Sequence, residues 1–190
     1  MTVERSRRRS RARALAAAIA ALGLAVAMPL TSASAQGHEH DQRSVLLQCQ
    51  GTESVSYSPG VTFRPRHFDV TIDGRFVSCV DVGGRVRSGS YQETFGLSAG
   101  CDDFLRGFTA QRTFHWSTGW STADTSVAEI SGSSTEVAGQ VVTTITGKVV
   151  KGRFKGRTAV EVITLAQPSA LECLTTGFTG ATGLTTLTIT

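Results

Sequence analysis

Short runs of alternating apolar and polar residues, separated by turn residues, constrain the fold of this chain more than any other feature. In the segment HFDVTIDG at residues 67–74, Phe68, Val70 and Ile72 alternate with polar side chains, which is the two-residue period of a strand with one buried face. The Asp-Gly step at its end predicts a hairpin turn. Similar runs recur towards the C-terminus, and no stretch after residue 35 predicts a helix longer than about two turns.

The alternation predicts about nine strands in an antiparallel immunoglobulin-like sandwich or a flattened barrel. The segment SGSST at residues 131–135 is expected to be a loop. In residues 108–116 the inward face of the strand includes Phe114 and Trp116, and Arg112 shares that face, which indicates a bulge or a position near a sheet end. The expected strands cover residues 53–57, 67–73, 75–80, 85–95, 102–116, 121–130, 140–150, 158–165 and 183–190.

Residues 1–35 have the pattern of a secretory signal peptide. Six arginines precede an apolar run at residues 14–30, and Ala-Ser-Ala at residues 33–35 supplies the small residues of a cleavage site. The run is shorter than the roughly 20 residues of a spanning helix, so we expect no transmembrane anchor. The consecutive arginines leave twin-arginine export open beside the general route. We therefore expect cleavage near Ala35, a secreted product, a flexible tail over residues 36–44 and one β-sandwich domain over residues 45–190.

The net charge of the whole chain, +4, comes from this leader. The leader holds six arginines and one glutamate, so residues 36–190 carry a net charge of −1. A nucleic-acid-binding domain needs a basic excess on its folded part. The composition therefore argues against a nucleic-acid partner.

The four cysteines, Cys49, Cys79, Cys101 and Cys173, all follow the leader. An even count in an exported chain predicts two disulfides, whereas a metal site of four thiolates usually needs paired C-x2-C spacings, which are missing here. Sequence alone allows three pairings. We favour Cys49–Cys79, which flanks two consecutive candidate strands, and Cys101–Cys173, which would tie the middle of the chain to a late strand.

Four segments of the chain have a distinctive order of turns, cysteines and strand ends: CQGTESVSYSPGVT at 49–62, TFHWSTGWSTA at 113–123, KGRFKGRTAVEVITL at 151–165 and LECLTTGFTGATGLTTLTIT at 171–190. They resemble a group of small secreted proteins of actinomycete bacteria, which has no assigned activity. The motifs consist of turns, cysteines and strand ends. The resemblance therefore implies a secreted all-β domain with two disulfides and brings no catalytic residues. The histidine-bearing tail before Cys49 departs from the pattern of the group.

Catalytic constellations find little support in the sequence. After the tail only His67 and His115 remain as bases for a hydrolase, and no G-x-S-x-G elbow occurs. Asp102-Asp103 is the one adjacent pair of acids, but neighbouring residues on a strand point to opposite faces and could not serve one substrate together. We predict no catalytic residues, and a hydrolase is the less favoured alternative.

Two groups of residues are candidates for binding. Trp120, beside a glycine, and Tyr57 would form an aromatic platform for a sugar or a peptide. The segment from residue 148 to 157 is rich in basic residues and reads as a hairpin tip, in which Lys151, Arg153 and Lys155 would contact anionic wall polymers or would only blunt a sheet edge.

The expected mature N-terminus, Gln36-Gly37-His38, offers an amine, two backbone amides and a histidine. Such a terminus can form a square-planar Cu(II) or Ni(II) site. Cyclisation of Gln36 would block the amine and abolish that site. We otherwise expect no cofactor.

Together these features predict a secreted, monomeric, non-catalytic binding module or an envelope-associated structural module. Its partner would be a cell-wall polymer or an extracellular protein. A protease inhibitor that presents a rigid loop, such as residues 81–90 or 117–121, is the main alternative.

Overall fold

The computed structural model describes residues 44–103, 105–118 and 124–190. The predicted signal peptide, the tail before residue 44 and Trp120 lie outside these residues. None of the described helices is long and apolar enough to cross a membrane.

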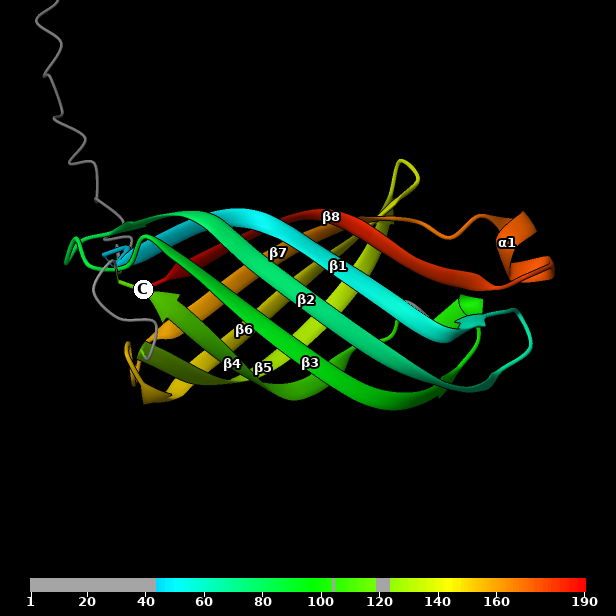
Figure 1. Cartoon of the computed structure of the whole chain (residues 1–190), viewed down its shortest axis with the longest axis horizontal. Helices are drawn as coiled ribbons and strands as arrows, with labels where there is room; N and C mark the ends of the chain where they lie inside the picture. The colour runs from blue at the N-terminus through cyan, green and yellow to red at the C-terminus, as the bar shows by residue number, and fades with distance from the viewer. Residues whose placement is uncertain (1–43, 104, 119–123) are drawn as a thin grey trace, which may run out of the picture. The chain divides into compact units, whose positions relative to one another are not determined.

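The described part of the chain is almost entirely β-structure (Figure 1). A 3-10 turn, Cys101–Asp103, follows the third strand, and the short helix α1, Ala170–Leu174, precedes the last strand. The strands are β1 Leu47–Val61, β2 Arg66–Asp81, β3 Ser88–Ala99, β4 Phe108–Ser117, β5 Asp124–Val137, β6 Gln140–Gly152, β7 Thr158–Ala166 and β8 Phe178–Ile189.

The eight strands form one closed antiparallel barrel in sequence order, in which β8 pairs with β1 (Figure 1). The prediction of an all-β fold is confirmed, whereas the nine-stranded immunoglobulin-like sandwich is wrong. The flattened barrel was the closer of the two expectations. Closure of a barrel pairs the first strand with the last. The alternation of apolar and polar residues within a strand does not indicate such a long-range pairing.

The expected hairpin at Asp73-Gly74 is also wrong, and this error accounts for the extra strand. Residues 66–81 form the single strand β2, with Gly74 opposite Tyr91 of β3. A Cβ at residue 74 would lie 2.0 Å from Tyr91 Cζ. Residue 74 must therefore be glycine because the inward ring of Tyr91 covers it. A glycine within a strand can mark such a close approach as well as a turn.

The segment at residues 131–135 belongs to β5 rather than to a loop. Gly132 lies beneath the ring of Phe108, and Ser134 hydrogen-bonds to Thr143 of β6 over 2.8 Å. Small and hydroxylated residues therefore serve strand packing here.

Two clusters of buried apolar side chains fill the barrel. The larger one includes Phe76, Phe114 and Trp116, and the smaller one includes Val61 and Phe68. Burial of apolar surface of this kind is the main stabilising contribution to folding.

Two disulfides brace the barrel, in the pairing that the sequence favoured. Cys49–Cys79 joins directly opposite residues of β1 and β2. Cys101–Cys173 ties the 3-10 turn to α1. The second bond therefore links the connection between β3 and β4 to the segment before β8.

Candidate functional site

The wall of the barrel is weakest between β3 and β4. These strands form only three ladder pairs, Ser88 with Ser117, Gly89 with Trp116 and Ser90 with His115. Among the described residues, no ladder pair joins them beyond this point, although β3 continues to Ala99 and β4 begins at Phe108. We call the facing strand edges, residues 91–99 of β3 and 108–114 of β4, the open seam.

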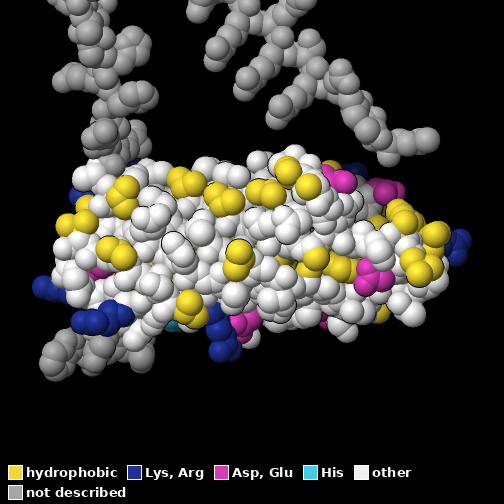
Figure 2. Space-filling model, turned by 90° about the horizontal axis from the view of Figure 1, so that it is seen from above, with side chains coloured by type: hydrophobic (Ala, Val, Ile, Leu, Met, Phe, Trp, Pro, Cys, Tyr) yellow, Lys and Arg dark blue, Asp and Glu magenta, His cyan; other side chains and the backbone are white. Residues whose placement is uncertain are grey.

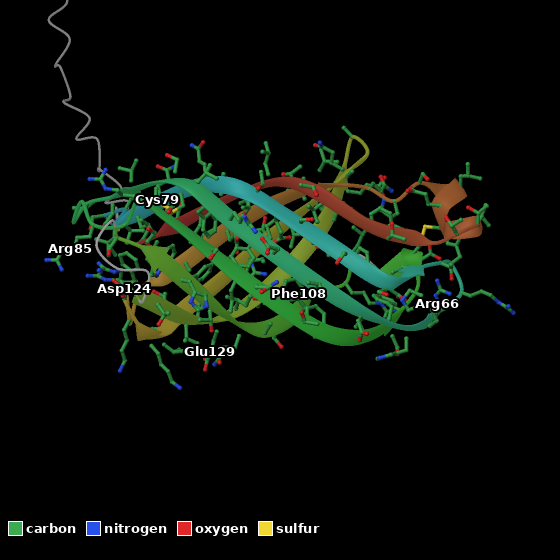
Figure 3. The ribbon with its side chains drawn as sticks, viewed as in Figure 1. Arg66, Cys79, Arg85, Phe108, Asp124 and Glu129 are labelled. Carbon is green, nitrogen blue, oxygen red and sulfur yellow. A yellow bond between two sulfur atoms is a disulfide. The ribbon has the colours of Figure 1, made fainter. Side chains whose placement is uncertain are left out.

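Three apolar side chains beside the open seam face the barrel interior yet remain exposed. Leu97 and Phe95 lie opposite the buried Phe68 and Val70 of β2, so they share the inner face. Phe108 lies opposite Gly132 on the inner face of β5 (Figure 3). Exposure is 44% for Phe95, 45% for Leu97 and 40% for Phe108.

This exposure differs from that of apolar residues on the outer surface. The view in Figure 2 shows hydrophobic side chains scattered among uncharged polar ones, with most charged groups towards the margins. Leu184, on the outer face of β8 opposite Thr52 and Thr164, is 69% exposed. Single exposed apolar residues are normal. Inward-facing ones that remain exposed mark a wall that is incomplete.

A buried group of charged side chains lies at the closed end of the open seam. Arg112 of β4 binds Glu93 of β3 through two contacts, Nε to Oε1 at 2.7 Å and Nη2 to Oε2 at 3.2 Å. Its Nη1 also donates to Oε2 of Glu161 on β7 at 2.5 Å and lies 3.9 Å from Oε2 of Glu53 on β1. One guanidinium therefore serves three carboxyl groups from three strands.

Hydroxyl groups complete this charge cluster. Tyr91 donates to Glu53 at 2.5 Å, and Thr185 donates to Glu161 at 2.9 Å. The guanidinium carbon of Arg112 lies 4.0 Å from the centre of the Tyr91 ring. Buried charged groups need this many hydrogen bonds and ion pairs, because the cost of desolvating them otherwise exceeds their Coulombic attraction.

The cluster holds more acid than base, and burial decides where a proton resides. Burial raises the pKa of Glu53 to about 7, against the opposing effects of the Tyr91 hydrogen bond and the charge of Arg112. Burial alone would lower the pKa of Arg112, but the neighbouring Glu161 and Glu93 outweigh it and raise that pKa. Arg112 therefore stays charged, while Glu53 gains or loses its proton near neutral pH.

Sequence reasoning missed this cluster, although the strand alternation contained the signal. Arg112 shares the face of Phe114 and Trp116, and β4 has no register shift that would turn it outward. Glu161 likewise shares the inward face of β7 with the buried Ala159 and Ile163. A charged residue at an inward position of each of two strands indicates an internal ion pair.

Tyr57, one half of the predicted aromatic platform, lies opposite the buried Val70 on the inner face of the barrel. Its ring packs against Phe68 at 5.8 Å and Phe178 at 5.6 Å between ring centres, and burial raises the pKa of its hydroxyl. Tyr57 therefore belongs to the packing of the smaller core cluster. Trp120, the other half of the platform, lies outside the described residues.

The basic segment forms the turn between β6 and β7. Arg153 is held by an ion pair with Asp124 and lies 5.8 Å from the centre of the Phe154 ring. Lys151 and Lys155 are exposed. Lys148 and Arg157 of the same segment are exposed as well, so four of its basic side chains are available to an anionic partner in solution.

The two histidines lie outside the barrel. Nδ1 of His67 is 3.4 Å from Oγ of Ser98, which is longer than a working contact between a base and a nucleophile. Among the described residues no hydrogen bond or ion pair joins His67 or His115 to an acid. Within the same residues, no three metal-ligating side chains are placed so that they could hold a metal ion. The proposed terminal chelate, Gln36-Gly37-His38, lies outside them.

A shallow depression of about 670 Å³ lies on the outer surface of β4 to β7. Hydroxyl groups and one carboxylate line it, and Figure 3 labels the acid, Glu129. No aromatic residue is among its lining. Its lining is Thr109, Ala110, Glu129, Ile130, Ser131, Thr146, Gly147 and Thr158.

Comparisons with protein-family models, with curated proteins and with solved structures found no match to this chain. The open seam and the charge cluster are therefore the features of the molecule that bear on its function.

Proposed function

We propose that this protein is an exported, non-catalytic binding module whose ligand occupies the open seam between β3 and β4. The observation that carries the proposal is the exposure of Phe95, Leu97 and Phe108 on a face whose other large side chains are mostly buried. An eight-stranded barrel is just wide enough to be filled by its own side chains or to hold one small ligand. A ligand that covered these three side chains would gain the free energy of burying their apolar surface.

The charge cluster supports a binding role rather than a catalytic one. Its carboxylates contact Arg112, Tyr91 or Thr185, so these polar groups are already bound to one another rather than directed at a substrate. Only Glu93 is partly accessible, with 16% of its side chain exposed. The cluster fixes the distance between β3 and β4 at one end of the open seam, which pre-organises the edges beyond it.

Export and membership of the actinomycete group are part of the same proposal. Two disulfides support an oxidising compartment, because cytosolic thiols are kept reduced. An exported protein cannot rely on cytosolic chaperones to cover exposed apolar side chains. A ligand or partner at the open seam would meet that need.

The test uses Nile red, a neutral dye whose fluorescence rises in apolar surroundings. We expect the protein to enhance its emission, and the variant Leu97→Ser to bind it about fivefold more weakly, since part of the apolar contact is lost. Leu184→Ser is the matched control, because it makes the same change on the outer face. Equal binding by both variants would show that the dye binds elsewhere and would refute the site.

A second candidate function, protease inhibition, draws support from the connection between β2 and β3. Asp81 accepts hydrogen bonds from the backbone amides of Gly83, Arg85 and Val86, each at 3.0 Å. The disulfide at Cys79 braces the same strand end. Within this loop Arg85 is exposed (Figure 3). Inhibition of trypsin that is lost in Arg85→Ala would support this role, and absence of inhibition would remove it.

A further inference from the structure

The open seam exposes backbone as well as side chains. β3 pairs with β2 along one edge up to Ala99, and β4 pairs with β5 along one edge from Phe108. Their other edges, residues 91–99 and 108–114, have no strand partner among the described residues. Unpaired strand edges are templates for another strand, because their amides and carbonyls still lack partners.

The outward side chains along these edges do not protect them. Natural proteins guard free edges with lysine, proline or inward-pointing charges. The inward-pointing charges of Glu93 and Arg112 lie at the closed end of the open seam, so they do not guard the edges beyond it. Here the outward positions carry Gln92, Thr94 and Ser98 on β3, and Thr109, Gln111 and Thr113 on β4. These residues are neutral and small or flexible, so they favour pairing with a further strand.

The register of the seam shows where a guest strand would begin. The three ladder pairs place Ser90 opposite His115, and continuing that register places Glu93 opposite Arg112. At that point side chains, rather than backbone groups, join the strands. The Glu93–Arg112 contact therefore marks the closed end, and the free edges extend from it towards Leu97 and Phe108.

We propose that the ligand of the open seam is an extended polypeptide segment that pairs with the free edges of β3 and β4 and turns apolar side chains towards Phe95, Leu97 and Phe108. This inference rests on the proposed binding function. Strand addition supplies affinity through main-chain hydrogen bonds and specificity through alternate side chains. A strand of five to seven residues, which is a common length, would match the free edges.

The test compares two synthetic peptides that differ only in their amides. The first alternates threonine and valine over eight residues, has a lysine at each end for solubility and carries fluorescein. The second has the same side chains, but every second residue is N-methylated, which removes the donors along one edge. We expect the first peptide to raise the fluorescence anisotropy on binding, and the second to bind at least tenfold more weakly, because buried carbonyls of the protein would lose their donors.

Hydrogen exchange locates the bound peptide. We expect slower amide exchange in residues 91–99 and 108–114 when the first peptide is bound. Leu97→Ser should weaken its binding several-fold, whereas Leu184→Ser should leave it unchanged. Protection confined to other strands would overturn the proposal.

The outcomes separate this inference from the proposed function. If Nile red binds at the seam but both peptides bind equally or neither binds, the ligand is a small apolar molecule and strand addition is wrong. If the peptides fail and the protein forms a dimer that protects the same edges, the occupant is a second copy of the chain, which also overturns the proposal. If neither Nile red nor the peptides bind at the seam, both the function and its extension are wrong.

Discussion

Arg112 of β4 holds Glu93 of β3 through two charge-assisted hydrogen bonds at the place where the backbone ladder between these strands ends. A planar guanidinium suits this role, because its donors match both oxygens of one carboxylate while further donors reach other partners. The same side chain contacts Glu161 across the barrel. One residue therefore joins the edge of the open seam to the opposite wall.

Replacement of Arg112 by methionine should destabilise the protein strongly. The variant keeps a similar volume but leaves Glu93, Glu161 and Glu53 without their cation. Removing one partner of a buried ion pair typically costs about 3–5 kcal/mol, because the remaining charge stays desolvated. Urea denaturation followed by tryptophan fluorescence measures this loss.

The matched control is Arg75→Met on β2. Arg75 pairs with Asp73 at 3.0 Å, but its side chain is 72% exposed. An exposed pair contributes at most about 1 kcal/mol. Similar losses in the two variants would contradict a structural role for the buried cluster.

Glu53 should make stability fall as the pH rises towards neutrality. The unfolded chain releases this proton near pH 4.5, whereas burial raises the pKa of Glu53 to about 7 in the folded protein. Between these values the folded protein holds a proton on Glu53 that the unfolded chain has released. The stabilisation from this proton is complete below about pH 4.5 and is lost as the pH rises through 7. We expect the free energy of unfolding to fall by up to about 3 kcal/mol over this range.

The variant Glu53→Gln isolates this effect. Glutamine keeps an oxygen that can accept the Tyr91 hydrogen bond and does not titrate. Its unfolding free energy, measured by denaturation between pH 4.5 and pH 7.5, should lack the decline seen in the parent protein. An equal decline in both proteins would assign the pH dependence to another group.

The sequence predicted most of the local structure, because strands record their burial as alternation. Trp116 is buried, the segments from Gln140 and Thr158 are strands, and a turn lies within the basic segment, all as expected. The predicted number of strands is wrong because β2 runs through Gly74 without a turn. The predicted sandwich is wrong because the sheet closes into a barrel. Both depend on contacts between distant residues, namely Tyr91 over Gly74 and β8 beside β1.

The open seam was harder to predict than the charge cluster. Arg112 and Glu161 occupy inward positions that alternation alone can identify. Phe95 and Leu97 also alternate like core residues, and only the loss of pairing between β3 and β4 leaves them exposed. The alternation within one strand does not show whether that strand pairs with its neighbour along its whole length.

Removal of either disulfide should reduce stability without changing the fold. The closed loops span 30 residues for Cys49–Cys79 and 72 residues for Cys101–Cys173. On the chain-entropy estimate each bond contributes roughly 3 to 4.5 kcal/mol, since it restricts the unfolded chain. Thermal unfolding of the two double alanine variants measures these losses. A variant as stable as the parent would show that strain in the folded state offsets the entropic gain.

Gly74→Ala should be costly, although the residue lies in the middle of a strand, where alanine is normally preferred to glycine. The new Cβ would meet the ring of Tyr91 at 2.0 Å from Cζ, and Tyr91 cannot move without loosening its hydrogen bond to Glu53. Overpacking of this kind typically costs about 1–3 kcal/mol. At Gly83 the nearest atom, Asp81 Oδ2, would lie at 3.4 Å, so Gly83→Ala should change stability little. Chemical denaturation of both variants therefore distinguishes a glycine required by packing from one in an open turn, and equal stability would place the Tyr91 ring elsewhere.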